Sequence, residues 1–251
     1  MIFIGEQFRT EISRPFSLLN LRRGREPINV STVSYKPEET QPVNHLLIKL
    51  KNSLEIKIPD CIDPAVQRFV NDCSQCMIQA DLPYRGRYLY LTVDNRPVKA
   101  GSTQRMPGWH LDGLQGEEVP FKLPACFVFS WTNQLPMAYT TQAFEVEKLN
   151  FRKHNIFDSL GAQVFNDSVF RLNANHLYLM NAYQLHQGVK ADHDILDKLF
   201  LRLYVSELPI TSRRMTINNK IDYPYPIHTT TGEIPQDLIT WNPDRAAGAC
   251  A

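Results

Sequence analysis

Apolar and polar residues alternate in short segments along the chain from about residue 86, and this pattern predicts a series of strands. Seven segments are rich in β-branched and aromatic residues and are bounded by Pro, Gly, Asn or Asp. They are residues 87–93, 109–112, 125–131, 138–146, 169–172, 176–181 and 199–206. Short strands at this spacing are typical of a sandwich or barrel and not of alternating βαβ units. We therefore expect a mainly β protein with supporting helices and a jelly-roll core.

One helix is predicted in the amino-terminal third, beginning at Asp63-Pro64. Asp63 suits the N-cap and Pro64 the first helical turn. Apolar residues then follow at helical spacing: Val66, Phe69, Val70, Cys73 and Met77. The Cys73-Ser74-Gln75-Cys76 motif lacks the second pair that a zinc ribbon requires, so we interpret its cysteines as small apolar residues on this helix. A weaker helix signal covers residues 155–163.

The chain of 251 residues is long enough for one domain with a substantial core. No repeat of fixed period divides it. We expect residues 1–83 to form a helix-containing support, residues 84–207 the jelly-roll core, and residues 208–251 an extension that is either packed over the barrel or partly mobile.

Charge and composition limit the classes of partner that the protein can bind. Lys and Arg number 27 against 26 Asp and Glu, and hydrophobic residues make up 43% of the chain. This balance creates no strong field for duplex nucleic acid or a membrane surface. Glu6 and Arg9 interrupt the start before an apolar run of signal-peptide length forms, and no run of about 18 apolar residues follows. We expect a cytoplasmic protein with a small-molecule substrate. The sequence does not specify its oligomeric state.

Candidate chemistry begins in the stretch PGWHLDG, residues 107–113. In a strand, His110 and Asp112 would share one face while Leu111 points to the other. Chance alone would produce roughly 0.7 such pairs from seven histidines. The pair gains weight from His186, which ends an apolar strand-like run and is followed two positions later by Gly188. Two histidines and one carboxylate, with the other positions open, are the ligands of non-haem Fe(II) oxygenases.

The segment 199–206 adds an arginine to this set. Leu199, Leu201, Leu203 and Val205 alternate with Phe200, Arg202, Tyr204 and Ser206. Arg202 is therefore flanked by core residues, and a buried guanidinium requires an anionic partner. Its planar fork of donors matches a carboxylate.

The order HxD, then a distal His followed at +2 by Gly, then an Arg on the next strand resembles the Fe(II)/2-oxoglutarate-dependent dioxygenase superfamily. The resemblance covers about residues 84–207 and implies a double-stranded β-helix. It implies Fe(II) bound by His110, Asp112 and His186, with Arg202 holding the distal carboxylate of 2-oxoglutarate. It further implies that O2 is consumed in hydroxylation, or a related C–H oxidation, of a small-molecule or amino-acid-like substrate.

The sequence departs from the superfamily at the second cosubstrate contact. Members often have Ser or Thr two residues after the arginine, whereas this chain has Tyr204 there. Tyr204 and Tyr90 are our candidates for that contact, although Tyr90, which shares a strand face with Tyr88, could equally fill the core. Gln104 and Arg105 lie just before the HxD pair, where a loop could reach the substrate.

Two other functions stay open. An Fe(II) oxidase of the same fold would use Arg202 for a substrate carboxylate and would not need 2-oxoglutarate. A non-catalytic jelly-roll binding protein would carry these residues by accident or around structural zinc, although structural zinc normally has four protein ligands and the sequence offers three. The five other histidines have no partner at ligand spacing and are interpreted as structural or surface residues: His45, His154, His176, His193 and His228.

Overall fold

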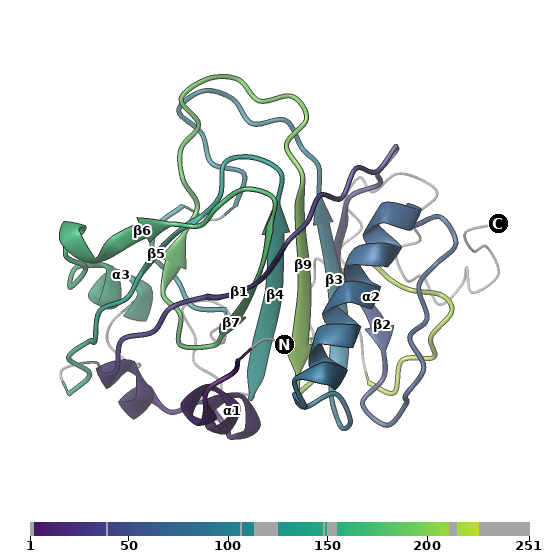
Figure 1. Ribbon diagram of the computed structural model, residues 1–251, viewed down its shortest axis with the longest axis horizontal. Helices are drawn as coiled ribbons and strands as arrows, with labels where there is room; N and C mark the ends of the chain where they lie inside the picture. The colour runs from purple at the N-terminus through teal and green to yellow at the C-terminus, as the bar shows by residue number, and fades with distance from the viewer. Residues whose placement is uncertain are drawn as a thin grey trace.

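The computed structural model describes residues 3–38, 40–105, 107–112, 125–147, 149, 155–210 and 215–225. Over these residues the chain is mainly β, with two antiparallel sheets and few helices, so this part of the sequence prediction is confirmed (Figure 1). Three α-helices lie in this part of the chain: α1 (Glu6–Ser13), α2 (Pro64–Gln79) and α3 (Ile156–Gly161). Two short 3-10 helices cover Leu18–Arg22 and Asn166–Ser168.

The larger sheet has six strands in the order β1-β7-β4-β9-β3-β2. Their bounds are β1 (Ile28–Thr32), β2 (Val43–Lys49), β3 (Tyr88–Asp94), β4 (Cys126–Thr132), β7 (His176–Asn181) and β9 (Phe200–Ser206). Every residue of the central strands β4 and β9 is buried. Because side chains alternate between the two faces of a strand, both faces of the sheet are covered at its centre.

Helix α2 covers one of these faces (Figure 1). Asp63 caps it by accepting a hydrogen bond from the Ala65 backbone N–H at 2.7 Å, and Pro64 occupies the first turn, as the sequence predicts. The buried face of α2 meets a continuous apolar surface on β3, β4, β7 and β9. Cys73 and Cys76 are free and buried in this core, so the CxxC motif acts as small apolar residues.

The opposite face is polar at its centre because of the register of the strands. Ser130 on β4 lies opposite Tyr178 on β7 and Arg202 on β9, and Arg202 in turn lies opposite Thr92 on β3. The neighbouring row, Met180–Val128–Tyr204–Tyr90, is apolar or aromatic and belongs to a separate core cluster. One face of the larger sheet thus carries a polar row, Tyr178–Ser130–Arg202–Thr92, beside an apolar row. We call the polar row the polar floor.

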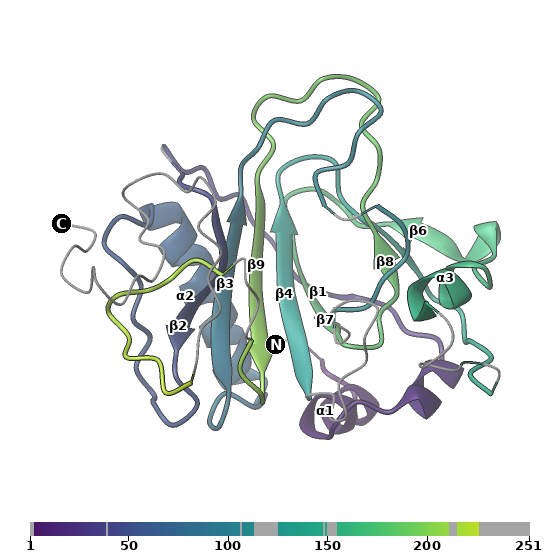
Figure 2. The same cartoon turned by 180° about the vertical axis from the view of Figure 1, so that it is seen from behind.

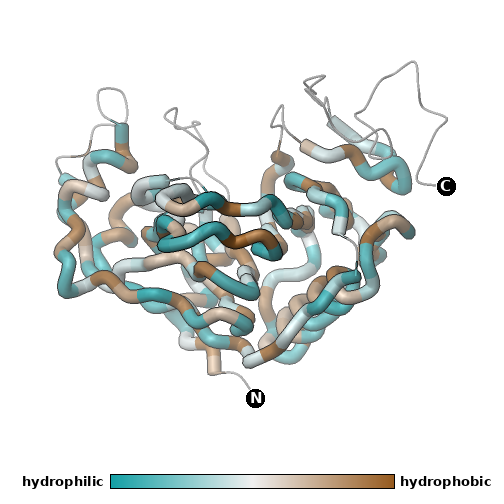
Figure 3. The backbone as a smooth tube through the Cα atoms, turned by 90° about the horizontal axis from the view of Figure 1, so that it is seen from above, coloured by the Kyte–Doolittle hydropathy of each residue, from teal (hydrophilic) through white to brown (hydrophobic). Residues whose placement is uncertain are grey.

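The smaller sheet has three strands in the order β6-β5-β8, namely β6 (Val169–Arg171), β5 (Ala138–Thr140) and β8 (His186–Gln187). It lies with α3 on the other side of the molecule from α2 (Figure 2). Leu111, Leu160 and Leu185 pack in a second core cluster in this region. Hydrophobic and hydrophilic positions interleave along the chain in the view from above (Figure 3), as expected for elements that each bury one face.

Two of the predicted strands are shorter in the structure than in the prediction. The strand predicted at 138–146 ends at Thr140, because the chain then turns and the Phe144 backbone N–H donates to Leu21 O instead of to a strand. The strand predicted at 109–112 is reduced to one backbone bridge, between His110 and His186.

Strands β1 and β2 were not predicted, and both come from the segment expected to act as a helical support. They form the two edges of the larger sheet. From the carboxy-terminal extension, the described residues 215–225 pack on the sheet: Met215 and Ile221 are buried in the cluster that contains Tyr90 and Tyr204.

Candidate functional site

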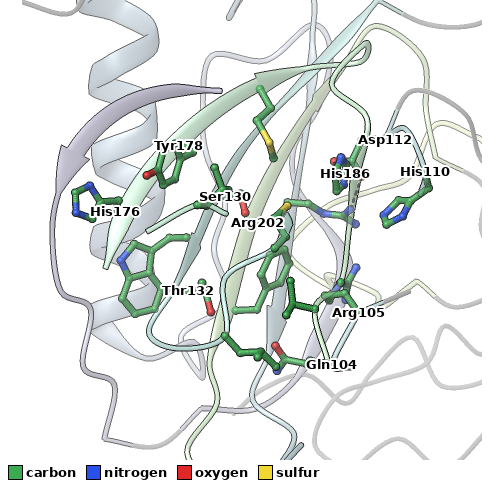
Figure 4. A pocket seen from close by; sticks show the side chains of 18 of the residues that line it. Gln104, Arg105, His110, Asp112, Ser130, Thr132, His176, Tyr178, His186 and Arg202 are labelled. Atoms are coloured by element: carbon green, nitrogen blue, oxygen red, sulfur yellow. Dashed lines mark hydrogen bonds and ion pairs between the residues drawn. The ribbon is translucent and has the colours of Figure 1, made fainter. Parts of the chain in front are cut away.

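A cavity of about 440 Å³ lies over the polar floor of the larger sheet. Strand β9 contributes Phe200 and Arg202, and β4 contributes Ser130 and Thr132. In Figure 4, His110, Asp112 and His186 gather at one end of the cavity, and His176 and Tyr178 lie at the other. The cavity therefore brings together segments that are far apart in the sequence.

The backbone bridge between His110 and His186 builds the first end. The His110 N–H donates to His186 O at 2.9 Å, and the His186 N–H donates to His110 O at 3.1 Å. The two imidazole rings consequently lie with their centroids 4.4 Å apart. Two histidines that the sequence separates by a long segment are neighbours because β8 pairs with the short stretch around His110.

Both imidazoles are oriented by backbone carbonyls. His110 Nδ1 lies 3.0 Å from Gly108 O, and His186 Nδ1 lies 2.8 Å from Gln184 O. Since a carbonyl oxygen only accepts, each Nδ1 donates an N–H, and Nε2 is the ring nitrogen that faces other partners. Burial, reinforced by His186, lowers the pKa of His110 to about 4, so this ring is neutral at pH 7. Imidazoles held by a carbonyl at one ring nitrogen resemble metal-ligating histidines.

Asp112 lies beside them, with its side chain 11% exposed. Its Oδ1 accepts a hydrogen bond from Arg202 Nη1 at 2.8 Å, and its Oδ2 lies 3.7 Å from His186 Nε2. Burial is the largest single influence and would raise the pKa of this carboxyl, but the surrounding charges, of which Arg202 is the strongest, together outweigh burial and lower the pKa to about 2. Asp112 is therefore the anionic partner that the buried position of Arg202 requires.

The three side chains have the donor types that a divalent transition metal prefers, two imidazole nitrogens and a carboxylate. With metal–ligand bonds of about 2.1 Å at right angles, as in an octahedral site, adjacent donor atoms would lie roughly 3.0 Å apart. The 3.7 Å between His186 Nε2 and Asp112 Oδ2 is longer than this. Within the described ranges, no group of three or more His, Cys, Asp or Glu side chains is placed so that it could hold a metal ion. The structure thus gathers the predicted residues, but Asp112 is engaged with Arg202.

His45 is a site residue that the sequence interpretation missed. Its Nε2 accepts a hydrogen bond from Arg202 Nη2 at 2.8 Å, and its side chain lines the cavity. It lies at an irregularity of β2 with a positive φ of 48°, and burial, reinforced by the charge of Arg202, lowers its pKa to about 3. No spacing in the sequence links His45 to Arg202, because the link depends on how β2, β3 and β9 pair.

His176 also lines the cavity, where its ring stacks on Tyr178 and its Nδ1 lies 3.0 Å from Asn29 Nδ2. Its place in the cavity was not predicted. Trp109 packs against the second core cluster. His154 and His228 lie outside the described residues.

Tyr90 and Tyr204 are not among the described residues that line the cavity. Tyr90 Oη accepts a hydrogen bond from the Ile210 backbone N–H at 3.0 Å and lies 2.8 Å from Tyr225 Oη. Tyr204 is buried in the same aromatic cluster, next to the row that contains Arg202. Their role as cosubstrate contacts stays a prediction.

Comparisons of the chain with protein-family models, with curated proteins and with solved structures return no significant match. In the part of the chain that the structure describes, no helix has the length and apolar character needed to span a membrane. The functional argument therefore depends on the geometry of the cavity.

Proposed function

We propose that this protein is a non-haem Fe(II)/2-oxoglutarate-dependent oxygenase that hydroxylates, or otherwise oxidises at a C–H bond, a small-molecule or amino-acid-like substrate. The convergence of His110, Asp112 and His186 at one end of a cavity supports this most. Each imidazole has its Nδ1 tied to a carbonyl, which leaves Nε2 available. A ring nitrogen that donates to a backbone carbonyl is a common feature of metal-ligating histidines.

A jelly-roll assignment is part of the same proposal. Two antiparallel sheets with a cavity between strands of both are compatible with a double-stranded β-helix. The HxD pair would lie at the entrance of this core, and His186 on a strand of the smaller sheet.

In this proposal His110, Asp112 and His186 hold Fe(II), and Arg202 binds the distal carboxylate of 2-oxoglutarate. When bound, Fe(II) with O2 and 2-oxoglutarate would supply oxidative decarboxylation of the cosubstrate coupled to oxidation of the substrate. The carbonyls of Gly108 and Gln184 keep the two imidazoles in place for this.

Arg202 has a second part in this scheme. Its guanidinium pairs with Asp112 at 2.8 Å and also donates to His45. A cosubstrate carboxylate at Arg202 would replace Asp112 as the partner of the guanidinium. Asp112 would then be free to act as a metal ligand, which links cosubstrate binding to completion of the ligand set.

An anaerobic titration of metal-free protein with Fe(II), followed by 2-oxoglutarate, tests the proposal. We expect a visible charge-transfer band that requires both additions. The band should be lost in His186→Ala and kept in His176→Ala, a matched control that removes a histidine from the far end of the same cavity. A band that survives in His186→Ala, or that never forms, would contradict the proposal.

The ion pair between Asp112 and Arg202 favours a second candidate, a non-catalytic protein that binds a small molecule in the same cavity. In that case Asp112 serves only as the structural partner of Arg202, and the titration would show no specific Fe(II) binding. Tight Fe(II) binding without the band would instead favour the oxidase that does not use 2-oxoglutarate.

A further inference from the structure

Arg105 is a cavity-lining guanidinium to which the proposed function assigns no role. Its side chain is 29% exposed, and its Cζ lies 4.9 Å from the centroid of the Phe200 ring. Its Nη1 lies 3.3 Å from Asp94 Oδ2. The stacking on Phe200 holds the guanidinium in position without using its N–H donors.

Asp94 is already satisfied by another arginine. Arg96 donates from Nε to Asp94 Oδ1 at 2.8 Å and from Nη2 to Oδ2 at 2.7 Å, which is a two-point pairing. The longer contact from Arg105 is therefore a secondary one. Arg105 retains donors that the Asp94 carboxylate does not use.

Positive charge exceeds negative charge in the cavity wall. Arg105 and Arg202 line it, whereas Asp112 is the one carboxylate among the described lining residues, and Arg202 already pairs with it. Lys198 also lines the cavity, but burial lowers its pKa to about 7, so it is only partly charged at pH 7. Burial, reinforced by the charge of Arg202, lowers the pKa of Arg105 to about 10, which still leaves it charged at pH 7. An anionic ligand would relieve the repulsion between the two guanidinium groups.

Unpaired polar atoms concentrate in the same wall. Within the described ranges, four buried side-chain atoms lack a hydrogen-bond partner: Gln41 Oε1, His45 Nδ1, Gln104 Oε1 and Arg202 Nε. Three of these four belong to residues that line the cavity. Buried polar atoms are normally paired, so a polar ligand in the cavity could supply partners that these described residues lack.

We propose that Arg105 binds a carboxylate of the substrate, as a subsite separate from the cosubstrate carboxylate at Arg202. Calling this ligand the substrate rests on the proposed function. The planar guanidinium fork matches a carboxylate, and the nearby carboxylates of Asp94 and Asp112 disfavour the larger charge of a phosphate. Apolar lining by Leu135, Leu172 and Val189 accommodates an aliphatic body. The volume lies near the lower end of the roughly 300–1,000 Å³ typical of small-molecule sites.

Isothermal titration calorimetry with defined probes tests this subsite. The probes are straight and branched carboxylic acids of four to eight carbons and free α-amino acids, each compared with its amide. The proteins are wild type, Arg105→Gln, Arg105→Lys, Arg202→Gln and Lys99→Gln. Lys99→Gln is the matched control, because it also removes one positive charge but from a side chain that is 75% exposed and outside the cavity wall.

We expect at least one acid to bind the wild type about ten-fold or more tightly than its amide. Arg105→Gln should abolish this preference, Arg105→Lys should retain part of it, and Lys99→Gln should leave it unchanged. Arg202→Gln should keep the preference but lose binding of 2-oxoglutarate. Circular dichroism of each variant verifies that it is folded.

The inference is overturned if no acid is preferred over its amide, or if Arg105→Gln retains the preference. Failure of the proposed function is a different result, in which the wild type does not bind 2-oxoglutarate with Fe(II) while the dependence on Arg105 persists. In that case the cavity is a carboxylate-binding site without oxygenase activity.

Discussion

The ion pair between Asp112 and Arg202 allows a quantitative prediction about the metal-free protein. Both side chains are about nine-tenths buried, at 11% and 10% exposure, and the pair is 2.8 Å long. Removing one partner leaves a buried charge unpaired, which typically costs about 3–5 kcal/mol. We therefore expect Arg202→Gln to lower the free energy of unfolding by an amount in this range.

The pKa of Asp112 gives the net effect of its surroundings on the ionised carboxyl. The protein lowers this pKa from 3.8 to about 2, and each pKa unit corresponds to about 1.4 kcal/mol, so the net stabilisation of the ionised carboxyl is about 2 kcal/mol. A depressed carboxyl pKa stabilises the fold above the unfolded value. This contribution is fully present at pH 7 and is lost as the pH falls from 3.8 toward 2.

A double-mutant cycle with Arg202→Gln, Asp112→Asn and the double variant measures the coupling by urea denaturation at pH 7 with a chelator present. We expect the sum of the two single effects to exceed the effect of the double variant by about 0.5–3 kcal/mol. A cycle on Lys99 and Asp194, an exposed pair with side chains 75% and 49% accessible, should give a much smaller coupling, because solvent screens exposed charges. Additive effects at Asp112 and Arg202, within about 0.5 kcal/mol, would refute the reasoning.

Three further predictions concern other parts of the molecule. Since the pKa values of His45 and His110 are lowered from 6.5 to about 3 and about 4, the unfolded chain takes up these protons first, and stability should fall as the pH drops from about 6.5 toward 4. Measured by urea unfolding, the free energy of unfolding of His45→Gln should change less steeply with pH than that of the wild type, by the equivalent of about one proton. An unchanged steepness would mean that His45 is not buried in its neutral form. Tyr90→Phe should lose about 1 kcal/mol from the hydrogen bonds of its hydroxyl while calorimetry finds unchanged 2-oxoglutarate binding, and weakened binding would instead make Tyr90 a cosubstrate contact. Gly24→Ala should destabilise by about 1–3 kcal/mol, because its Cβ would lie 2.0 Å from Thr141 O, and an unaltered urea midpoint would contradict that close approach.

Much of the local structure was predictable because its signals are local. Helix α2 follows from Asp63-Pro64 and the apolar spacing after it, and β7 matches the predicted residues 176–181. The alternation along β9 correctly placed Arg202 on the face opposite Leu201 and Leu203. In each case a residue and its near neighbours in the chain carry the information.

The candidate site was predictable in its residue types and only partly in its geometry. The pattern of His110, Asp112 and His186 was recognised, and the structure brings these residues together. The need of Arg202 for an anion was also recognised. That Asp112 is this anion, and that His45 accepts from the same guanidinium, could not be read from the spacing.

By itself, the sequence determined which faces of its strands are apolar, where its main helix begins, and which side chains have the chemistry that the proposed site needs. The tertiary structure alone decided that β1 and β2 form the edges of the larger sheet and that Ser130, Tyr178 and Arg202 share one row. The physical reason is that alternation specifies the face of a side chain, whereas its neighbours depend on strand order and register. Both are set by pairing between segments far apart in the chain, and that pairing creates the cavity.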